Sequence, residues 1–275
     1  MSLSVNTNVG AMTALQYLSK TQADMSKTQT AISTGYKVAS AKDDGATYAI
    51  AQNMRGNVAA YTSVTDSLSR GMSAVDTALS AGQSISDLLV QMKAKALSAS
   101  DASIDTASRQ ALNNDFTALR DQITTITKNA VFNGFNLTDG STTSITALAS
   151  TDGSRRITVS AQKMTLSGSI VTVKSTGTIS TAAKASTMIA TVQASLTNVG
   201  AALAKLSAGS KKYSIQMDFA SKLSDTLQSG IGNLVDANMA QESAKLTSLQ
   251  TKQQLGVQAL SISNQSPQTI LSLFK

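Results

Sequence analysis

Asp43 and Asp44 are adjacent carboxylates, and residues of this type and spacing could act as a general acid and a general base. That chemistry needs partner groups to position the pair and the substrate, and the neighbouring sequence supplies none. Both residues directly precede a helical pattern, where Asp suits the N-cap and the positive end of the helix dipole. We therefore interpret Asp43 and Asp44 as residues that start a helix.

The composition also argues against an enzyme. The 275 residues contain no His and no Cys, so the usual general base, the commonest metal ligand and the thiol nucleophile are missing. Neighbouring Ser and Lys residues such as Ser210 and Lys211 are expected by chance in a Ser-rich chain. We expect no catalytic residue, no metal site and no cofactor.

The net charge of +7 raises the alternative of a polyanion ligand. The 23 basic residues are scattered, with Arg155–Arg156 and Lys211–Lys212 as the adjacent pairs and no interleaved aromatics for base stacking. We interpret this charge as solvated helix faces and expect no nucleic acid partner. Binding to an anionic glycan or DNA stays open as a secondary property.

Neither a Sec signal peptide nor a membrane span is expected. Residues 1–20 lack a basic segment followed by an unbroken apolar run, and the sequence contains no run of 18 apolar residues. A cytosolic protein, or one exported without a signal peptide, fits these features.

The elements that would position any site are long helices. In residues 185–234 apolar residues alternate in steps of three and four, which is a heptad pattern on a helix. The positions between them are mostly small or polar, so the helix exposes a narrow apolar stripe and must pack on other helices. The stripe consists of Ile189, Val192, Leu196, Val199, Leu203, Leu206, Tyr213, Met217, Ala220, Leu227, Ile231 and Leu234.

Similar stripes predict three earlier helices and one later helix. They cover residues 5–32, 46–97 and 106–129, and the last resumes after a bend at Gly230 and Gly232 and reaches Pro267, which kinks it or opens a final turn. Between 131 and 181 the helical period stops, and Arg156–Ser160 and Ile170–Lys174 alternate as strands do.

The predicted fold is mainly α: an elongated antiparallel, coiled-coil-like bundle with a small β-hairpin region at its tip and paired terminal helices. We expect the segments 1–35 and 231–275 to form the terminal-helix domain, 36–45 a connector, 46–130 and 182–230 the bundle helices, and 131–181 the hairpin region. The predicted bundle seam contains Met54, Tyr61, Leu68, Val75, Leu89, Leu112, Phe116, Leu119, Ile123, Leu196, Leu203, Leu206, Tyr213 and Leu227.

The two terminal helices are amphipathic, and each is weak alone. They could close as an internal two-helix hairpin, or they could finish folding only against neighbouring copies. We favour the second interpretation, because coupled folding and assembly suits segments too weak to fold alone.

Two motifs at opposite ends of the chain resemble the signatures of bacterial flagellins. The amino-terminal motif comprises Asn6–Asn8, Leu15 and Ile32–Gly35 leading into Ser40–Ala51, and the carboxy-terminal motif runs from Gln253–Gly256 through Asn264–Gln268 to Leu271–Leu273. Phe132–Gly134 also resembles the family's turn into its hairpin. The short middle region is similar to the compact flagellins of alphaproteobacteria.

This resemblance implies a structural subunit that polymerises into the extracellular flagellar filament for motility. It implies a helical homopolymer, unfolded export through the flagellar type III apparatus, a cytosolic chaperone, and contacts with hook-associated junction and cap proteins, without membrane insertion. The residues expected in the filament core are Val5, Val9, Met12, Leu15, Leu18, Met25, Ile32, Met239, Leu246, Leu249, Val257, Leu260, Leu271 and Leu273. A hook–filament junction protein, which has similar ends, is the alternative.

The resemblance bears on two further sets of residues. Positions that a Toll-like receptor reads in many flagellins hold Gln91, Lys95 and Asp115 here, which implies a degenerate receptor patch. The hydroxyls of Thr142, Thr143, Ser144 and Thr146 are candidates for O-glycosylation, although Ser and Thr are also ordinary turn residues.

Overall fold

Long helices joined by short connections make up most of the chain, in keeping with its many Ala, Leu, Gln and Lys residues and its single Pro. The computed structural model describes residues 7–272, with residues 266–272 by their backbone alone. In that range the elements are α1 (Val9–Thr34), α2 (Gly45–Ser100), α3 (Thr106–Asn129), β1 (Val131–Phe132), β2 (Phe135–Asn136), β3 (Ser144–Leu148), β4 (Arg156–Ser160), α4 (Ala182–Val235) and α5 (Met239–Ser272). The expected mainly α fold with hairpins and paired terminal helices is confirmed.

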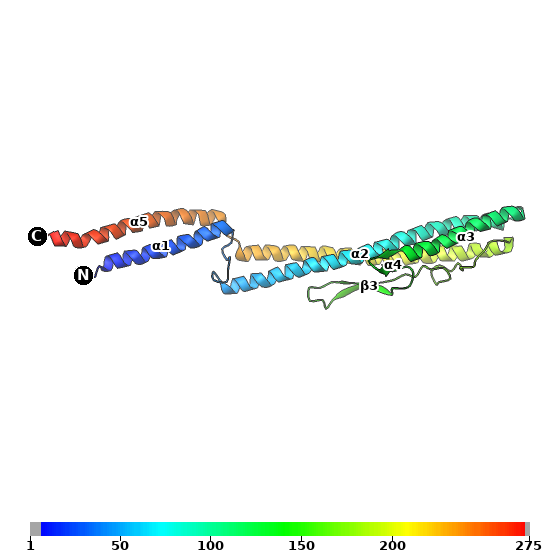
Figure 1. The fold of residues 1–275 in the computed structure, drawn as a ribbon, viewed down its shortest axis with the longest axis horizontal. Helices are drawn as coiled ribbons and strands as arrows, with labels where there is room; N and C mark the ends of the chain where they lie inside the picture. Colours follow the sequence, from blue (N-terminus) through cyan, green and yellow to red (C-terminus); the bar gives the residue numbers. More distant parts are fainter. Residues whose placement is uncertain (1–6, 273–275) are drawn as a thin grey trace. The chain divides into compact units, whose positions relative to one another are not determined.

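The chain divides into two units, which we call the terminal unit (residues 1–56 with 226–275) and the central unit (residues 57–225). In the terminal unit α1 and α5 lie side by side and antiparallel (Figure 1). Two side-chain hydrogen bonds join them: the Asn8 side chain before α1 donates to the Ser263 carbonyl at 2.7 Å, and near the middle of the pair the Gln253 amide donates to the Gln22 side chain at 2.7 Å.

A short connector follows α1. Gly35 ends the helix in the left-handed conformation, with φ of 75°, and its N–H bonds to the Ala31 carbonyl. Asp44 caps α2 by accepting from the backbone N–H groups of Ala46 and Thr47. The interpretation of this aspartate as a helix-start residue is therefore confirmed.

Asp43 has a different role in the connector. Its carboxylate accepts hydrogen bonds from the backbone N–H groups of Ala39 and Ser40 and from the Ser40 hydroxyl, so it closes the turn before the helix. The bonds from Ser40 lower the pKa of Asp43, as those from Thr47 lower the pKa of Asp44. Both carboxylates are therefore charged and accept hydrogen bonds from nearby backbone N–H groups. They do not form a pair that exchanges a proton.

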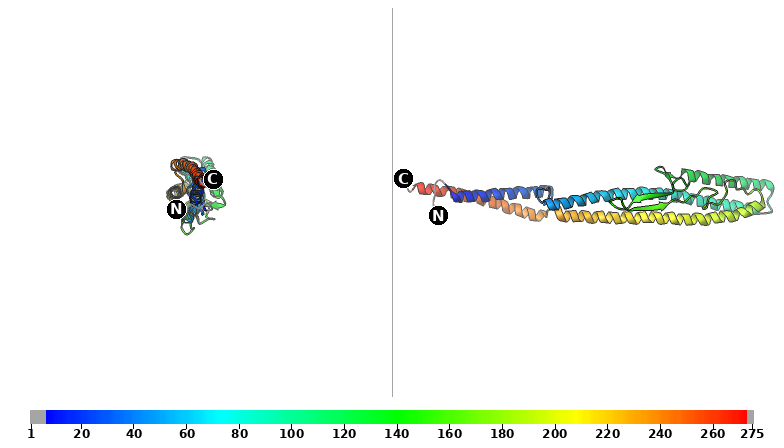
Figure 2. Two further views of the ribbon diagram at one scale, coloured as in Figure 1. Left: turned by 90° about the vertical axis from the view of Figure 1, so that its left-hand side faces the viewer. Right: turned by 90° about the horizontal axis from the view of Figure 1, so that it is seen from below.

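The central unit is built on the side-by-side packing of α2, α3 and α4, which Figure 2 shows from two further sides. The α3 helix returns along α2 after a turn, and Asp105 caps it by accepting from the Ser108 N–H at 2.6 Å. The fully buried core includes Leu68, Ile85, Leu89, Met92, Phe116, Ile123, Leu137, Met164, Ile179, Leu206 and Tyr213.

Two antiparallel hairpins pack on these helices. The β1–β2 pair turns at Asn133 and Gly134, both of which have positive φ (47° and 82°), as a tight hairpin turn requires. In the longer hairpin Ser144 pairs with Ser160 and Leu148 with Arg156. The Leu148 N–H donates to the Ser67 hydroxyl of α2 at 3.1 Å, so this hairpin lies along the flank of the helices rather than beyond their ends (Figure 1).

The predicted strand at Ile170–Lys174 is wrong. Val171 and Val173 are buried, which explains the alternating pattern, but the segment bonds to itself and to α4. The Ser167 N–H donates to the Val173 carbonyl at 2.8 Å, and the Thr172 N–H donates to the Ser195 hydroxyl at 3.0 Å. These bonds form an irregular turn instead of a ladder.

The interruption predicted at Gly230 and Gly232 lies slightly later in the chain, because α4 continues to Val235 and α5 begins at Met239. The Val235 carbonyl accepts from the N–H groups of Lys37 and Val38, so the connector supplies the bonds that end the helix. The chain then restarts as α5, where the Asn238 side chain accepts from the Gln241 N–H at 3.2 Å. Helix α5 runs past Pro267 to Ser272.

Candidate assembly surface

The contact between α1 and α5 is a seam in which large apolar residues are interspersed with small and polar ones. The less exposed positions recur every three or four residues on both helices, as two packed helices require. The seam consists of Ala11, Ala14, Leu18, Thr21, Met25, Thr28 and Ala31 on α1, and of Glu242, Leu246, Leu249, Gln253, Gly256, Leu260 and Ser263 on α5. Its large apolar side chains are Leu18, Met25, Leu246, Leu249 and Leu260, and its other positions are small or polar.

A second group of large apolar side chains in the same two helices is exposed. We call it the outer apolar set: Val9, Met12, Leu15 and Tyr17 on α1, and Met239, Leu255, Val257 and Ile262 on α5. Tyr17 and Ile262 are each 69% exposed. Leu255 and Ile262 are seven residues apart, about 140° round the helix from the seam, so they share a face that α1 does not cover. An apolar surface of this kind marks a site for further protein contacts.

The residues predicted for the filament core fall into three groups. Leu18, Met25, Leu246, Leu249 and Leu260 lie in the seam, with the half-buried Ile32 at its end, whereas Val9, Met12, Leu15, Met239 and Val257 belong to the outer apolar set. Val5 and Leu273 lie outside the described residues, and Leu271 is described by its backbone alone.

Within one chain α1 and α5 pair with each other, as the alternative of an internal two-helix hairpin requires, so the seam has its partner in the same chain. Three exposed residues, Tyr17, Leu255 and Ile262, were missed by the sequence search. Leu255 and Ile262 share a face through their seven-residue spacing, which is the signal that could have found them, whereas Tyr17 carries no comparable signal.

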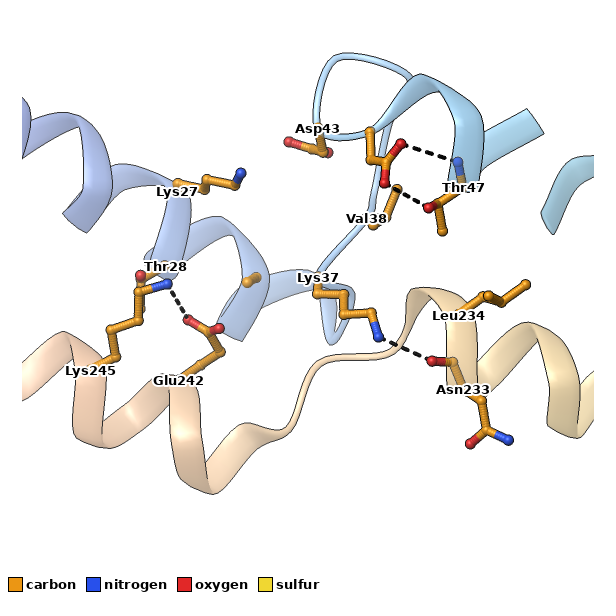
Figure 3. A pocket seen from close by; sticks show the side chains of 12 residues that line it. Lys27, Thr28, Lys37, Val38, Asp43, Thr47, Asn233, Leu234, Glu242 and Lys245 are labelled. Atoms are coloured by element: carbon orange, nitrogen blue, oxygen red, sulfur yellow. Dashed lines mark hydrogen bonds and ion pairs between the residues drawn. The ribbon is translucent and has the colours of Figure 1, made fainter. Parts of the chain in front are cut away.

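A cavity of about 470 Å³ lies in the terminal unit beside the connector (Figure 3). Its charged groups largely bind neighbours in the chain: the Lys37 ammonium donates to the Asn233 carbonyl at 3.0 Å, and the Lys245 ammonium lies 3.5 Å from the Glu242 carboxylate. Thr28 also lines the cavity and is buried, but its hydroxyl has no hydrogen-bond partner among the described residues. The cavity presents no acid, base and nucleophile in catalytic arrangement.

The predicted bundle seam lies mostly in the core of the central unit. Leu68, Val75, Leu89, Phe116, Ile123, Leu206 and Tyr213 are buried there, and Tyr61, Leu112, Leu119, Leu196 and Leu203 are partly buried against them. Met54 and Leu227 are half-buried residues of the terminal unit.

The three residues of the predicted receptor patch lie on α2 and α3. The Lys95 ammonium is 2.7 Å from the Asp115 carboxylate, with the side chains 38% and 56% exposed, while Gln91 is exposed beside them. The two charges therefore neutralise each other, and an exposed pair of this kind contributes little to stability.

The four candidate hydroxyls lie in and just before β3. Thr143 and Thr146 are exposed, with Thr146 3.2 Å from the Thr158 hydroxyl of the paired strand. Thr142 and Ser144 are half-buried, and the Thr142 hydroxyl accepts from the Asn136 N–H at 3.3 Å.

Within residues 7–272 no group of three or more Asp or Glu side chains is placed to hold a metal ion. None of the described helices combines the length and the hydropathy that a lipid bilayer would require of a spanning segment.

Comparison with known proteins gives matches over nearly the whole chain. The family model described as "Bacterial flagellin N-terminal helical region" matches residues 5–143, and that of the "Bacterial flagellin C-terminal helical region" matches residues 189–274. Flagellin FljK of Caulobacter vibrioides is 52% identical over 272 residues, which cover 99% of this chain and 98% of that protein. A flagellin of Brucella melitensis is 36% identical over 281 residues, covering 99% of each chain.

The fold is also similar to a solved structure. The crystal structure of Bacillus cereus flagellin aligns with a TM-score of 0.50 at 20% identity, covering 56% of this chain and 88% of that one. At this identity the likeness concerns the fold alone.

Proposed function

The chain belongs to the bacterial flagellin family and is a structural subunit of the flagellar filament rather than an enzyme, and we propose that its copies polymerise through the outer apolar set. The observation that carries this proposal is the exposure of large apolar side chains on faces of α1 and α5 that the α1–α5 seam leaves uncovered. Neighbouring terminal units would cover those faces.

The energy available from this contact is substantial. Burial of a large apolar side chain contributes roughly 1.5–3 kcal/mol before the cost of association is subtracted. The outer apolar set contains residues on both helices, so a subunit can contact more than one neighbour at once. Such a surface suits a polymer in which each terminal unit is surrounded by others.

We extend the proposal to the partners that an exported subunit needs. A cytosolic chaperone would cover the exposed residues of α5 before export, since they invite premature association. The flagellar type III apparatus would carry the chain out of the cell, and junction and cap proteins would contact the ends of the extracellular filament. The absence of Cys supports this route, because no thiol can cross-link the chain outside the cell.

The hook–filament junction protein is the weaker alternative. Similarity to flagellins at 52% identity extends over 272 residues, through the middle of the chain as well as its ends. A junction protein that shared only its ends with flagellins would not match in this way.

We further propose that Thr143 and Thr146 carry O-linked sugars, since both side chains are exposed, Thr146 in strand β3 of the longer hairpin and Thr143 just before it. Thr142 and Ser144 are less accessible acceptors. Intact mass spectrometry of protein from native filaments tests this modification, and a mass equal to that of the unmodified chain would remove it.

Seeded polymerisation of the Leu255→Asp variant tests the assembly surface. Leu255 is exposed, so the variant should fold as the wild type does, yet its new carboxylate would be desolvated at the contact and should abolish filaments. Thr176→Asp places the same charge on an exposed loop of the central unit and should leave assembly unchanged. Normal filaments from Leu255→Asp would defeat the proposal.

A further inference from the structure

The outer face of α4 carries an exposed apolar pair in the central unit. Ile215 and Phe219 are four residues apart, hence on one face of the helix, and are 59% and 54% exposed. Asp218 is exposed beside them and has no ion-pair partner among the described residues. We call Ile215, Asp218 and Phe219 the α4 knob. The chain's own packing leaves both apolar side chains largely uncovered.

A groove of about 320 Å³ lies elsewhere in the same unit, where α2 meets the two hairpins. Phe132 and Phe135 line one part of it, with Phe135 47% exposed, and Arg70 of α2 lines another. Arg70 is exposed and has no ion-pair partner in the described part of the chain. The groove thus offers aromatic rings beside an exposed guanidinium group.

The knob of one chain faces away from its own groove. Tyr213 of α4 points to the hairpin, since its hydroxyl lies 3.0 Å from the carbonyl of Ile145, which lines the groove. Ile215 and Phe219 follow Tyr213 by two and six residues, which places them about 200° and 240° round the helix from it. The two surfaces can therefore meet only between different molecules.

We propose that the α4 knob of one copy inserts into the groove beside Arg70, Phe132 and Phe135 of a neighbouring copy. This contact rests on the proposed function, because it requires that copies polymerise, and it is separate from the outer apolar set. Two different patches of one chain that fit each other form a heterologous contact, the kind that propagates into open helical polymers.

Shape and charge both favour a second copy as the occupant. An aromatic or aliphatic anchor in a small pocket is the usual centre of a protein–protein contact. Asp218 would meet Arg70, and Asp66, exposed one turn before Arg70, would offer a counter-charge to Lys211, which is exposed beside the knob.

Disulfide cross-linking of the full chain tests the contact directly, because the natural sequence contains no Cys. Filaments of the Ile215→Cys, Phe135→Cys double variant should give a ladder of covalent multimers on mild oxidation, while the monomer should give none. The Ile215→Cys, Thr176→Cys variant is the matched control and should give no ladder. Filaments that assemble but yield no ladder from the first pair would overturn the inference.

Charge reversal tests the same contact without relying on cysteine. Arg70→Asp and Asp218→Arg should each raise the critical concentration for seeded polymerisation by about threefold or more, and the double variant should restore it. Unchanged critical concentrations in both single variants would overturn the inference and leave the filament function standing. Failure of the proposed function would be recognised by a different result, namely that the Leu255→Asp variant forms normal filaments.

Discussion

The hydroxyl oxygen of Tyr213 lies 3.0 Å from the carbonyl oxygen of Ile145, which ties the middle of α4 to the first strand of the longer hairpin. The carbonyl of Ile157 on the paired strand is 3.3 Å away, so the hydroxyl donates toward both strands. The side chain is fully buried, and this burial raises the pKa of Tyr213 to about 12.

This pKa predicts a loss of stability at alkaline pH. The hydroxyl of Tyr213 loses its proton near pH 10 in the unfolded chain and only near pH 12 in the folded chain. The protonated hydroxyl therefore makes its full contribution to the free energy of unfolding below pH 10, and this contribution is lost as the pH rises from 10 to 12. The shift corresponds to roughly 3 kcal/mol. Tyr213→Phe should cost about 1 kcal/mol at pH 7 and should show a smaller alkaline loss. Chemical denaturation of both proteins at pH 7, 9 and 11 measures the difference, and a pH-independent difference would contradict the assignment.

Glycine at position 209 lets the hairpin approach α4. A Cβ added there would lie 2.6 Å from a methyl carbon of Val159, whereas one added at Gly200 of the same helix would meet nothing within 4 Å. Gly209→Ala should therefore destabilise the protein by about 1–3 kcal/mol. Gly200→Ala should stabilise it by about 0.5–1 kcal/mol, since Ala is the better helix former. Thermal unfolding of the two variants gives the comparison, and a stabilised Gly209→Ala would show that the hairpin can move away.

The sequence predicts those helices and strands in which buried residues recur at a regular spacing. It does not predict features that depend on contacts between residues far apart in the chain. The heptads predict the helices, and Arg156–Ser160 forms β4 as expected. Val171 and Val173 alternate in burial as strand residues do, yet their segment is bonded as a turn. The end of α4 at Val235 depends on N–H groups of the connector almost 200 residues earlier, which no local pattern encodes.

The sequence indicates which segments carry the proposed assembly surface, but it does not indicate which helix faces belong to that surface. The apolar residues of the terminal segments are visible in the sequence, but periodicity does not say which stripe covers the partner helix and which stays exposed. Leu249 is buried in the seam, while Leu255, six residues later, is exposed. The choice follows from how α1 and α5 pack, and therefore from the structure.

Thr28 offers a test of the seam. Its buried hydroxyl has no hydrogen-bond partner among the described residues, so Thr28→Val should stabilise the α1–α5 pair by about 1 kcal/mol. Thr30→Val is the matched control, because Thr30 is exposed and its hydroxyl donates to the Ser26 carbonyl, and it should change stability by less than about 0.5 kcal/mol. Amide exchange of α1 measures both. A destabilised Thr28→Val would mean that the hydroxyl binds a partner after all, such as a water.

Hydrogen exchange of the monomer should distinguish the terminal pair from the bundle. Contacts across the α1–α5 seam include polar pairs such as Asn8 with Ser263 and Gln22 with Gln253, so opening of this two-helix pair should cost less free energy than opening of a helix in the central core. Opening of α2 or α3 exposes Leu89 or Phe116, which are fully buried.

Peptides containing Met12 and Leu255 should therefore exchange faster in the monomer than peptides containing Leu89 and Phe116, and limited proteolysis should trim the two ends first. In filaments the difference should shrink, because neighbouring copies would then cover the outer apolar set and opening would expose it. Equal protection of the terminal and central helices in the monomer would mean that the α1–α5 seam alone keeps the terminal helices folded. Folding of the two ends would then not be coupled to assembly.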